Sequence, residues 1–232
     1  MKKEMVNLYA SGALLPISWP VLPVTRMQPG ILLSTTAMIP SLKPVSAVSI
    51  ATDAIDRLHS TASSHKRVMV IEVMGHKAGW IALYSGMAGG GDVILIPELS
   101  YNIHNIGDTI LNRLKRGKPY SIVVVAEGIQ TDGRKRAAEY IAQEIEYETG
   151  IETREPVLGY IQRGGSPTPF DRNLSTRMGG HATELIAGAR FGRMVTLKGN
   201  EISSAPLEEI AGKLKLVTEE HDLVVQGKRM GI

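Results

Sequence analysis

Residues 68–77 read VMVIEVMGHK, an apolar run of strand length that ends at a glycine followed by a histidine and a lysine. Such a run, short and rich in valine and isoleucine, is typical of a β-strand buried on both faces. Runs of this kind recur at Val68–Val73, Val93–Ile96, Ile122–Val125 and Met194–Leu197. Longer segments with helical spacing separate them, at Ile106–Leu114, Ala137–Tyr147 and Leu174–Ile186. The alternation predicts right-handed βαβ units, and therefore an α/β fold with a parallel sheet that helices cover on both faces.

The loops after the predicted strands are the first candidates for a site, because ligands of such sheets bind beyond the carboxyl ends of the strands. These loops are Met74–Lys77, Pro97–Glu98, Glu127–Gly128 and, after the short segment Glu155–Leu158, Gly159–Arg163. Each places a glycine or a charged residue where a strand ends. For any single loop, a glycine turn that only connects two elements explains the residues equally well.

Composition narrows the classes of protein that remain. The 232 residues are 43% hydrophobic, which predicts one large globular domain or two small ones. A formal charge of +3 and an aromatic content of 5% are too small to favour nucleic-acid binding, and no run is apolar enough for a membrane span. The chain has no cysteine, which excludes disulfides and thiol catalysis and favours the cytoplasm. Its six histidines are scattered, so no metal site is predicted.

The first 44 residues differ from the rest, being apolar and rich in proline with no sustained period. Lys2 and Lys3 before an apolar run are similar to the start of a signal peptide. Pro16, Pro20 and Pro23 interrupt that run, however, and no small-residue cleavage site follows. We therefore expect residues 1–44 to be an atypical, disordered leader.

The segment Arg163-Gly164-Gly165-Ser166 combines an arginine with a glycine pair ahead of a predicted helix. Glycines let the backbone approach an anion, a helix N-terminus supplies unpaired N–H groups, and arginine adds a bidentate donor. The combination predicts a phosphate-binding site, although a surface arginine beside a glycine turn is also common. Further basic residues occupy comparable positions near the ends of strands, namely Arg67, Arg116, Lys118 and Arg154. Such a set, if it converges, would suit a ligand with several phosphates.

Four stretches carry a resemblance to a known family: residues 59–83 (HSTASSHKRVMVIEVMGHKAGWIAL), 88–98 (AGGGDVILIPE), 123–128 (VVVAEG) and 148–172 (ETGIETREPVLGYIQRGGSPTPFDR). In this order and spacing they closely resemble the later part of 6-phosphofructokinases, from about Val45 to the C-terminus. The resemblance implies the parallel-sheet, two-lobe phosphofructokinase-like fold with its larger, N-terminal lobe incomplete. Residues 45–161 would form the substrate-binding lobe, 162–213 a remnant of the larger lobe, and 214–232 a C-terminal return to the substrate-binding lobe.

The same resemblance implies an activity and partners. The family transfers a phosphoryl group to the 1-hydroxyl of fructose 6-phosphate, giving fructose 1,6-bisphosphate in glycolysis, with Mg²⁺ bridging the phosphates of the donor. The donor is ATP or pyrophosphate, and the residues present do not choose between them. Because the family's site is shared between subunits, a homo-oligomer, tetramer or dimer, is also implied.

Residue by residue, the family's sugar-phosphate site maps onto eight positions. Arg67 and Arg154 match arginines that reach the 6-phosphate across a subunit interface, and Arg163 matches one that binds sugar phosphate within the same subunit. Met74 and Gly75 match the loop against the sugar. Glu127 matches a carboxylate that holds sugar hydroxyls. The last two positions depart from the best-known bacterial pattern, with His76 in place of an arginine and Tyr160 in place of a histidine.

A second predicted site consists of Gly90, Asp92, Arg116 and Lys118. These match positions at which allosteric bacterial members bind a nucleoside diphosphate or phosphoenolpyruvate. Many relatives keep the fold without this regulation, so a purely structural role for the four residues stays open.

The front of the family's sequence cannot be read in residues 1–44. The glycine-rich loop, the GGDGS-type loop that meets the donor, and the TIDND-type segment with the catalytic aspartate are all missing from this stretch. Reread from the third base of each codon, Leu32–Thr36 permits Thr-Ile-Asp-Asn, which suggests a shifted frame. We therefore predict no catalytic base and no metal ligand here, and impaired or absent turnover.

Two other interpretations stay open. The chain could be a non-catalytic sugar-phosphate or effector-binding subunit that acts with an intact paralogue. It could also be an unrelated nucleotide-binding oxidoreductase, which is disfavoured because Gly86–Gly91 precedes a strand instead of following one. If the chain is a phosphofructokinase relative in either role, the strand around Val195 should lack partners, expose its edges and make the isolated chain poorly soluble.

Overall fold

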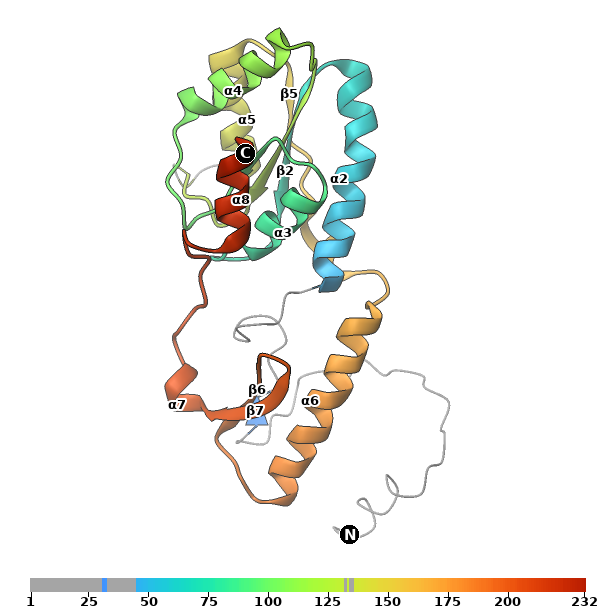
Figure 1. Cartoon of the computed structure of the whole chain (residues 1–232), viewed down its shortest axis with the longest axis vertical. Helices are drawn as coiled ribbons and strands as arrows, with labels where there is room; N and C mark the ends of the chain where they lie inside the picture. The colour runs from blue at the N-terminus through green and yellow to red at the C-terminus, as the bar shows by residue number, and fades with distance from the viewer. Residues whose placement is uncertain (1–30, 33–44, 132, 134–135) are drawn as a thin grey trace.

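The computed structural model describes residues 31–32, 45–131, 133 and 136–232. Two sheets divide the described chain, and they lie at opposite ends of the molecule (Figure 1). The predictions for residues 1–44 lie outside the described residues, apart from strand β1, Ile31–Leu32.

The first sheet has four parallel strands in the order β3-β4-β2-β5. Strands β2 (Val68–Val73) and β4 (Ser121–Ala126) form its centre and are buried along their full length. They pair in register from Val68 opposite Ser121 to Val73 opposite Ala126. The flanking strands are β3 (Val93–Leu95) and β5 (Thr153–Arg154). Three of the four predicted strands are therefore confirmed here, together with the parallel sheet.

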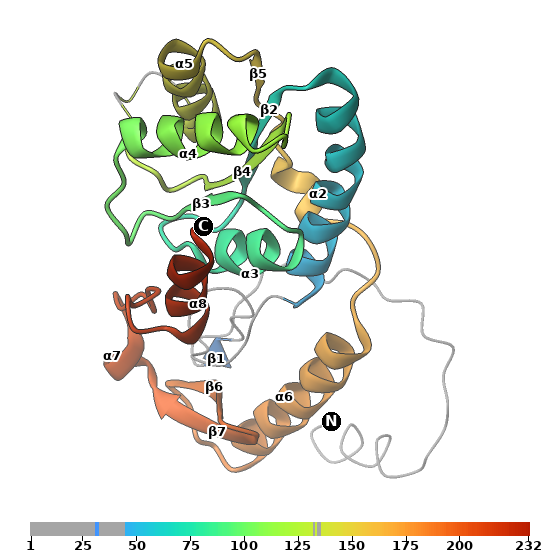
Figure 2. The ribbon, with the colours of Figure 1, turned by 45° about the horizontal axis from the view of Figure 1, so that its top comes forward.

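Helices cover both faces of this sheet, as the continuous apolar strands require. On one face, α2 (Val45–His65), α3 (Trp80–Ala88) and α8 (Asp222–Met230) pack against alternate strand residues such as Ile71 and Val124. On the other face, α4 (Ile103–Lys115) and α5 (Ala137–Thr149) pack against Val70 and Val123. Figure 2 shows the strands between these two groups of helices.

The polypeptide leaves the first sheet through a 3₁₀ helix, η1 (Gly159–Arg163), and then forms α6 (Pro169–Ala187). Thr168 caps α6, because its Oγ1 accepts the N–H of Asp171, and Pro169 occupies the first turn without losing a hydrogen bond. The predicted boundary between residues 161 and 162 falls inside η1.

The second sheet contains β1, β6 (Arg193–Lys198) and β7 (Glu201–Pro206) in the order β1-β6-β7. Strand β6 pairs in parallel with β1 and antiparallel with β7, so the parallel pattern does not extend throughout this sheet. The expectation that the strand around Val195 lacks partners is wrong, because β7 pairs with β6 along its full length and Val195 is 1% exposed. At the other edge, β1 pairs only with Arg193 and Met194, so the rest of that edge has no strand neighbour among the described residues. Helix α6 packs on this sheet through Leu185 and Leu174.

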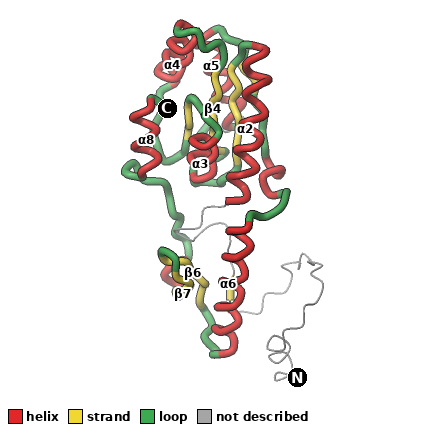
Figure 3. Tube along the Cα trace, turned by 45° about the vertical axis from the view of Figure 1, so that its right-hand side comes forward, coloured by secondary structure: helices red, strands yellow, loops and turns green. Residues whose placement is uncertain are grey.

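The C-terminal segment returns to the first sheet after a short helix, α7 (Leu207–Ile210). Figure 3 shows α2 and α6 along one side of the molecule and the returning chain on the other. One carboxylate holds the returning chain in place, since Glu98 Oε1 accepts from Gly79 N at 2.9 Å and from Val217 N at 3.0 Å. Within the described ranges, no helix combines the length and the apolarity that crossing a membrane would require.

Candidate functional site

Two loops meet at the carboxyl end of the first sheet, one after β2 and one after β4. Glu127 joins them, because its Oε1 accepts hydrogen bonds from Gly75 N at 3.1 Å and His76 N at 2.6 Å. The Glu127 backbone also donates to Val73 O at 2.9 Å. A Cβ on Gly128 would lie 2.3 Å from the carbonyl oxygen of His76, so only glycine permits this approach. The loops are therefore held together by one carboxylate and by backbone contact.

His76 has a left-handed backbone, with a φ of +54°. Histidine is one of the residue types that tolerate this region, and such a conformation persists where the surroundings hold it. Here the hydrogen bond from His76 N to Glu127 helps to keep the backbone of His76 in this conformation. The turn leaves the His76 residue exposed at the end of β2.

Helix η1 joins the same group of loops through a buried glutamine that was not among the predicted site residues. Gln162 is 2% exposed, and its Oε1 accepts from Met74 N at 2.7 Å. Its Nε2 is buried and has no hydrogen-bond partner among the described residues. The only signal for Gln162 in the sequence was its place inside the IQRGG stretch, between Tyr160 and Arg163.

Tyr160 and Arg163 extend from η1 toward solvent beside these loops. Tyr160 is 79% exposed, and the Arg163 guanidinium carbon lies 5.2 Å from the centre of its ring, a cation–π contact. The structure thus gathers six of the eight predicted sugar-phosphate residues at the carboxyl end of the sheet, namely Met74, Gly75, His76, Glu127, Tyr160 and Arg163.

The other two predicted residues, Arg67 and Arg154, lie at the opposite end of the sheet. Arg67 immediately precedes β2, and the six residues of β2 separate it from Met74 by roughly 20 Å. Both arginines bind one carboxylate, with Glu152 3.1 Å from Arg67 and 2.5 Å from Arg154. The predicted basic residues therefore do not converge within one chain, because strand direction places them at two different ends.

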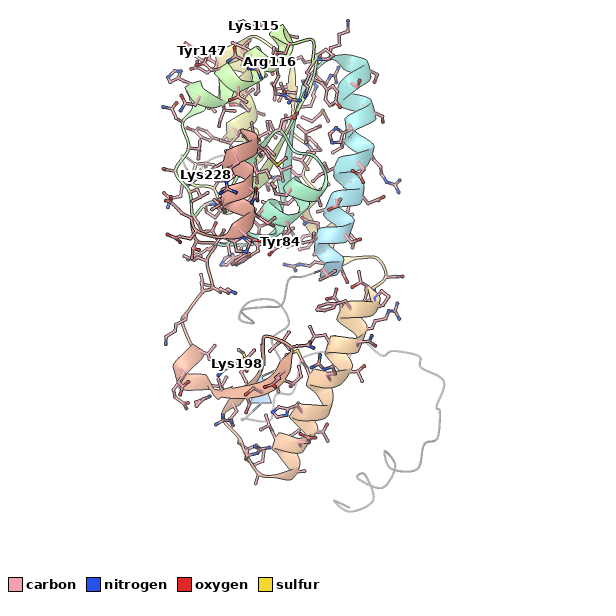
Figure 4. All side chains as sticks on the ribbon, viewed as in Figure 1. Tyr84, Lys115, Arg116, Tyr147, Lys198 and Lys228 are labelled. Atoms are coloured by element: carbon pink, nitrogen blue, oxygen red, sulfur yellow. The ribbon has the colours of Figure 1, made fainter. Side chains whose placement is uncertain are left out.

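A cavity of about 500 Å³ lies near this second end of the sheet. All four predicted effector residues, Gly90, Asp92, Arg116 and Lys118, line it. Figure 4 shows Arg116 at the far end of the molecule from Lys198. Sequence reasoning missed other lining residues, since nothing in local sequence brings α4 and the C-terminal segment together; among them are Thr109, Asn112, Arg113, Met230 and Ile232.

The charges around this cavity are only partly compensated. Neighbouring residues compensate the negative charge of Asp92, because Arg113 lies 2.6 Å from one carboxylate oxygen and Ile122 N donates to the other at 2.9 Å. The side chains of Arg116 and Lys118 have no hydrogen bond or ion pair with any described residue. Two cations are thus free to meet an anion.

Two groups with shifted pKa values lie outside both sets of residues. Burial, followed by the neighbours Tyr140 and Glu144, raises the pKa of Tyr101. Burial also lowers the pKa of Lys215, whose ammonium lies 5.3 Å from the centre of the Trp80 ring. In the described part of the chain, no three or more His, Cys, Asp or Glu residues are grouped so that they could hold a metal ion.

Together these features define an α/β protein whose parallel sheet is covered on both faces and carries polar loops at both ends. The chain belongs to the phosphofructokinase family, whose model matches residues 44–186. Its α/β fold is that of phosphofructokinases: a pyrophosphate-dependent phosphofructokinase from Marinobacter aquaeolei superimposes with a TM-score of 0.65, at 26% identity over 77% of this chain and 50% of that one. The phosphofructokinase from Saccharomyces cerevisiae gives a TM-score of 0.64, at 30% identity over 71% of this chain and 23% of that one.

Curated relatives agree with this assignment. The chain is 89% identical over 187 residues to ATP-dependent 6-phosphofructokinase 3 of Bacteroides thetaiotaomicron, covering 81% of this chain and 56% of that protein. It is 50% identical to an ATP-dependent 6-phosphofructokinase of Spirochaeta thermophila, covering 80% and 56%. It is also 46% identical to a pyrophosphate–fructose 6-phosphate 1-phosphotransferase of Streptomyces coelicolor, covering 74% and 55%. The chain therefore spans about half the length of the curated relatives it matches.

Proposed function

We propose that the carboxyl end of the first sheet binds fructose 6-phosphate. The observation that carries this proposal is the position of Glu127, whose Oε1 holds Gly75 and His76 while its Oε2 has no hydrogen bond to a described residue. That oxygen is free to accept hydrogen bonds from sugar hydroxyls. Arg163, exposed at the edge of the same loops, supplies a cation for a phosphate group.

Arg67 and Arg154 would serve the sugar phosphate bound to a neighbouring subunit. Their separation from Glu127 and Arg163 by the length of β2 supports this division, since one ligand of this size cannot touch both ends. A homo-oligomer, a dimer or tetramer, would bring the two ends of different copies together. In a free chain, Glu152 neutralises part of the charge of the two arginines.

The reaction that this site would serve is phosphoryl transfer to the 1-hydroxyl of fructose 6-phosphate, which yields fructose 1,6-bisphosphate in glycolysis. Glu127 and Met74 would orient the sugar, and the Tyr160 hydroxyl, as a hydrogen-bond donor, would meet a phosphate oxygen. Position 76 would offer the transferring group a more permanent positive charge if it held an arginine in place of the histidine. Relatives that use ATP and relatives that use pyrophosphate both occur, so the donor stays open between the two.

Mg²⁺ is expected to arrive with the phosphates of the donor. The described residues do not fit a resident magnesium site, because Glu127 already spends one carboxylate oxygen on backbone amides and no acidic cluster among them could hold the ion. We therefore assign no step to a metal held by this part of the chain.

We further propose that the 232 residues by themselves bind fructose 6-phosphate in the cytoplasm but turn it over slowly or not at all. The residues described at the carboxyl end of the first sheet include no aspartate placed as a base, and one oxygen of Glu127 already accepts from two backbone amides. An alternative role is that of a non-catalytic sugar-phosphate or effector-binding subunit that acts with an intact paralogue. Co-purification of such a paralogue would support it.

The cavity around Arg116 and Lys118 is proposed to bind an anionic effector, either a nucleoside diphosphate or phosphoenolpyruvate. Its two unpaired cations and its volume of about 500 Å³ support this role. The glycine segment around Gly90 would let backbone approach the phosphate.

The first test measures calorimetric binding of fructose 6-phosphate and turnover with Mg²⁺ and either ATP or pyrophosphate, on the purified full chain. We expect binding without substantial turnover. The variant Arg163→Ala should weaken binding about tenfold or more, since a charge-assisted contact is lost. Arg57→Ala is the matched control, because this exposed arginine pairs with Asp53 on the surface of α2, away from the site. Turnover that depends on Arg163 would overturn the proposed loss of catalysis, and absence of sugar-phosphate binding would overturn the site.

A further inference from the structure

His59 lies between two segments that line the effector cavity, although it is not itself among the lining residues. From helix α2, its Nε2 lies 2.7 Å from the carbonyl oxygen of Gly89, and its Nδ1 lies 3.3 Å from the Tyr120 hydroxyl. The first segment, residues 89–92, carries Gly90 and Asp92. The second segment, residues 116–120, carries Arg116 and Lys118. One side chain thus contacts a residue of each segment, Gly89 and Tyr120, although neither of these two residues lines the cavity itself.

The partners of His59 determine its tautomer. The carbonyl oxygen of Gly89 can only accept, so Nε2 must carry a proton. In the neutral ring, Nδ1 then accepts the hydrogen of the Tyr120 hydroxyl. The two rings meet edge to face, with centres 5.8 Å apart and planes at 83°, which fixes the orientation of the imidazole.

The contact from His59 adds to the packing and the backbone bonds that hold the glycine segment. Gly90 has a φ of +69°, and a Cβ on Gly89 would lie 2.7 Å from Cγ2 of Ile55, so α2 packs directly against the backbone here. Glycines have the largest backbone freedom of any residue, and consecutive glycines therefore do not stay in one conformation without contacts. Backbone bonds hold the N–H groups of Gly89, Gly91 and Asp92, which donate to Ser85 O, Gly86 O and Ile122 O at 2.8 Å, while His59 holds the carbonyl oxygen of Gly89.

We propose that His59 is a positioning residue of the effector cavity. By donating to Gly89 and accepting from Tyr120, it sets the separation between the glycine wall and the wall that carries Arg116 and Lys118. It acts through these walls and does not itself bind the ligand. This inference rests on the proposed effector role of the cavity.

Contacts of Asp92 with α4 and β4 keep the role of His59 separable from folding. Asp92 is tied to Arg113 at 2.6 Å and to Ile122 N at 2.9 Å, independently of His59. Loss of the His59 contacts should therefore loosen residues 89–91 while the surrounding sheet and helices remain intact. Ligand affinity is expected to change more than the melting temperature.

The experiment compares four variants of the full chain. His59→Leu removes both contacts, whereas His59→Gln keeps an amide that can donate to Gly89 O. Tyr120→Phe removes only the contact to Nδ1. Ser60→Ala is the matched control, because Ser60 is the next residue of α2, is exposed, and bonds to Arg57 O within its own helix. Calorimetry with ADP and with phosphoenolpyruvate gives the affinity, and hydrogen exchange of residues 89–92 gives a readout that needs no ligand.

We expect His59→Leu to weaken binding of the preferred ligand about tenfold and to accelerate exchange of residues 89–92, with the melting temperature nearly unchanged. His59→Gln and Tyr120→Phe each keep a donor to Gly89 O but lose the link between His59 and Tyr120, so they should weaken binding about threefold, and Ser60→Ala should match the parent chain. Failure of the parent chain to bind either ligand would overturn the effector role, and the exchange rates would still test the positioning role. Unchanged affinity and exchange in His59→Leu, or a His59→Gln variant as impaired as His59→Leu, would overturn the inference.

Discussion

The backbone nitrogen of His76 lies 2.6 Å from Oε1 of Glu127, so the residue after β4 fixes the turn after β2. The same oxygen accepts from Gly75 N, so one carboxylate joins the loop after β2 to the loop after β4. A proposed sugar-binding side chain therefore has a structural task as well. Its replacement should affect folding and binding by different amounts.

Glu127→Ala should lower the free energy of unfolding by roughly 1–3 kcal/mol, because two backbone amides lose their acceptor. Glu127→Gln keeps an acceptor oxygen and should recover most of the stability, but not the binding of fructose 6-phosphate. Urea denaturation and calorimetry measure the two effects. Glu220→Gln, an exposed position, serves as the control, and equal stability of the alanine and glutamine variants would contradict the role of the hydrogen bonds.

Glu152→Gln should strengthen binding of fructose 6-phosphate severalfold if the proposed oligomer forms. The change removes the negative charge that Arg67 and Arg154 share, while the surface ion pairs contribute only about 0–1 kcal/mol of stability. The gain should shrink at high salt, since screening weakens exposed charges. Glu155→Gln nearby is the control, and a decrease in affinity at low salt would show that Glu152 helps to position the arginines instead of competing with phosphate.

Gly128→Ala should destabilise the protein by about 1–3 kcal/mol, because the new Cβ would lie 2.3 Å from the His76 carbonyl oxygen and push the two loops apart.

For Gly180→Ala we expect the opposite effect on stability. Gly180 lies within helix α6, and an added Cβ there would meet no described atom of another element within 4 Å, so alanine should stabilise the helix by roughly 0.5–1 kcal/mol. Thermal or urea unfolding checks both signs, and a neutral Gly128→Ala would mean that the loops have room to separate.

Lys118→Ala should weaken binding of ADP or phosphoenolpyruvate about three- to tenfold and reduce the dependence of binding on salt. Lys118 lines the cavity and its side chain has no partner among the described residues, so its charge is available to a ligand. Lys198→Ala, at the other end of the molecule (Figure 4), should leave binding unchanged. Equal effects of the two substitutions would indicate a general charge effect without a site.

The sequence by itself determined the central strands and the family to which the chain belongs. Val68–Val73 and the run around Val123 are apolar along almost their whole length, and strands buried on both faces need that pattern. The local order of strands and helices then dictated a parallel sheet. Six of the eight sugar-phosphate candidates were found together because parallel strands end at the same edge.

Tertiary structure alone decided which residues hold those candidates in place and which strands meet. Gln162, His59 and Glu98 act on partners that lie 30 or more residues away in the sequence, and no local period marks such contacts. The pairing of β6 with β1 is likewise a contact between segments that lie far apart in the sequence. The split between Arg67 and Arg163 follows from the direction of β2, since the two ends of one strand cannot serve the same small ligand.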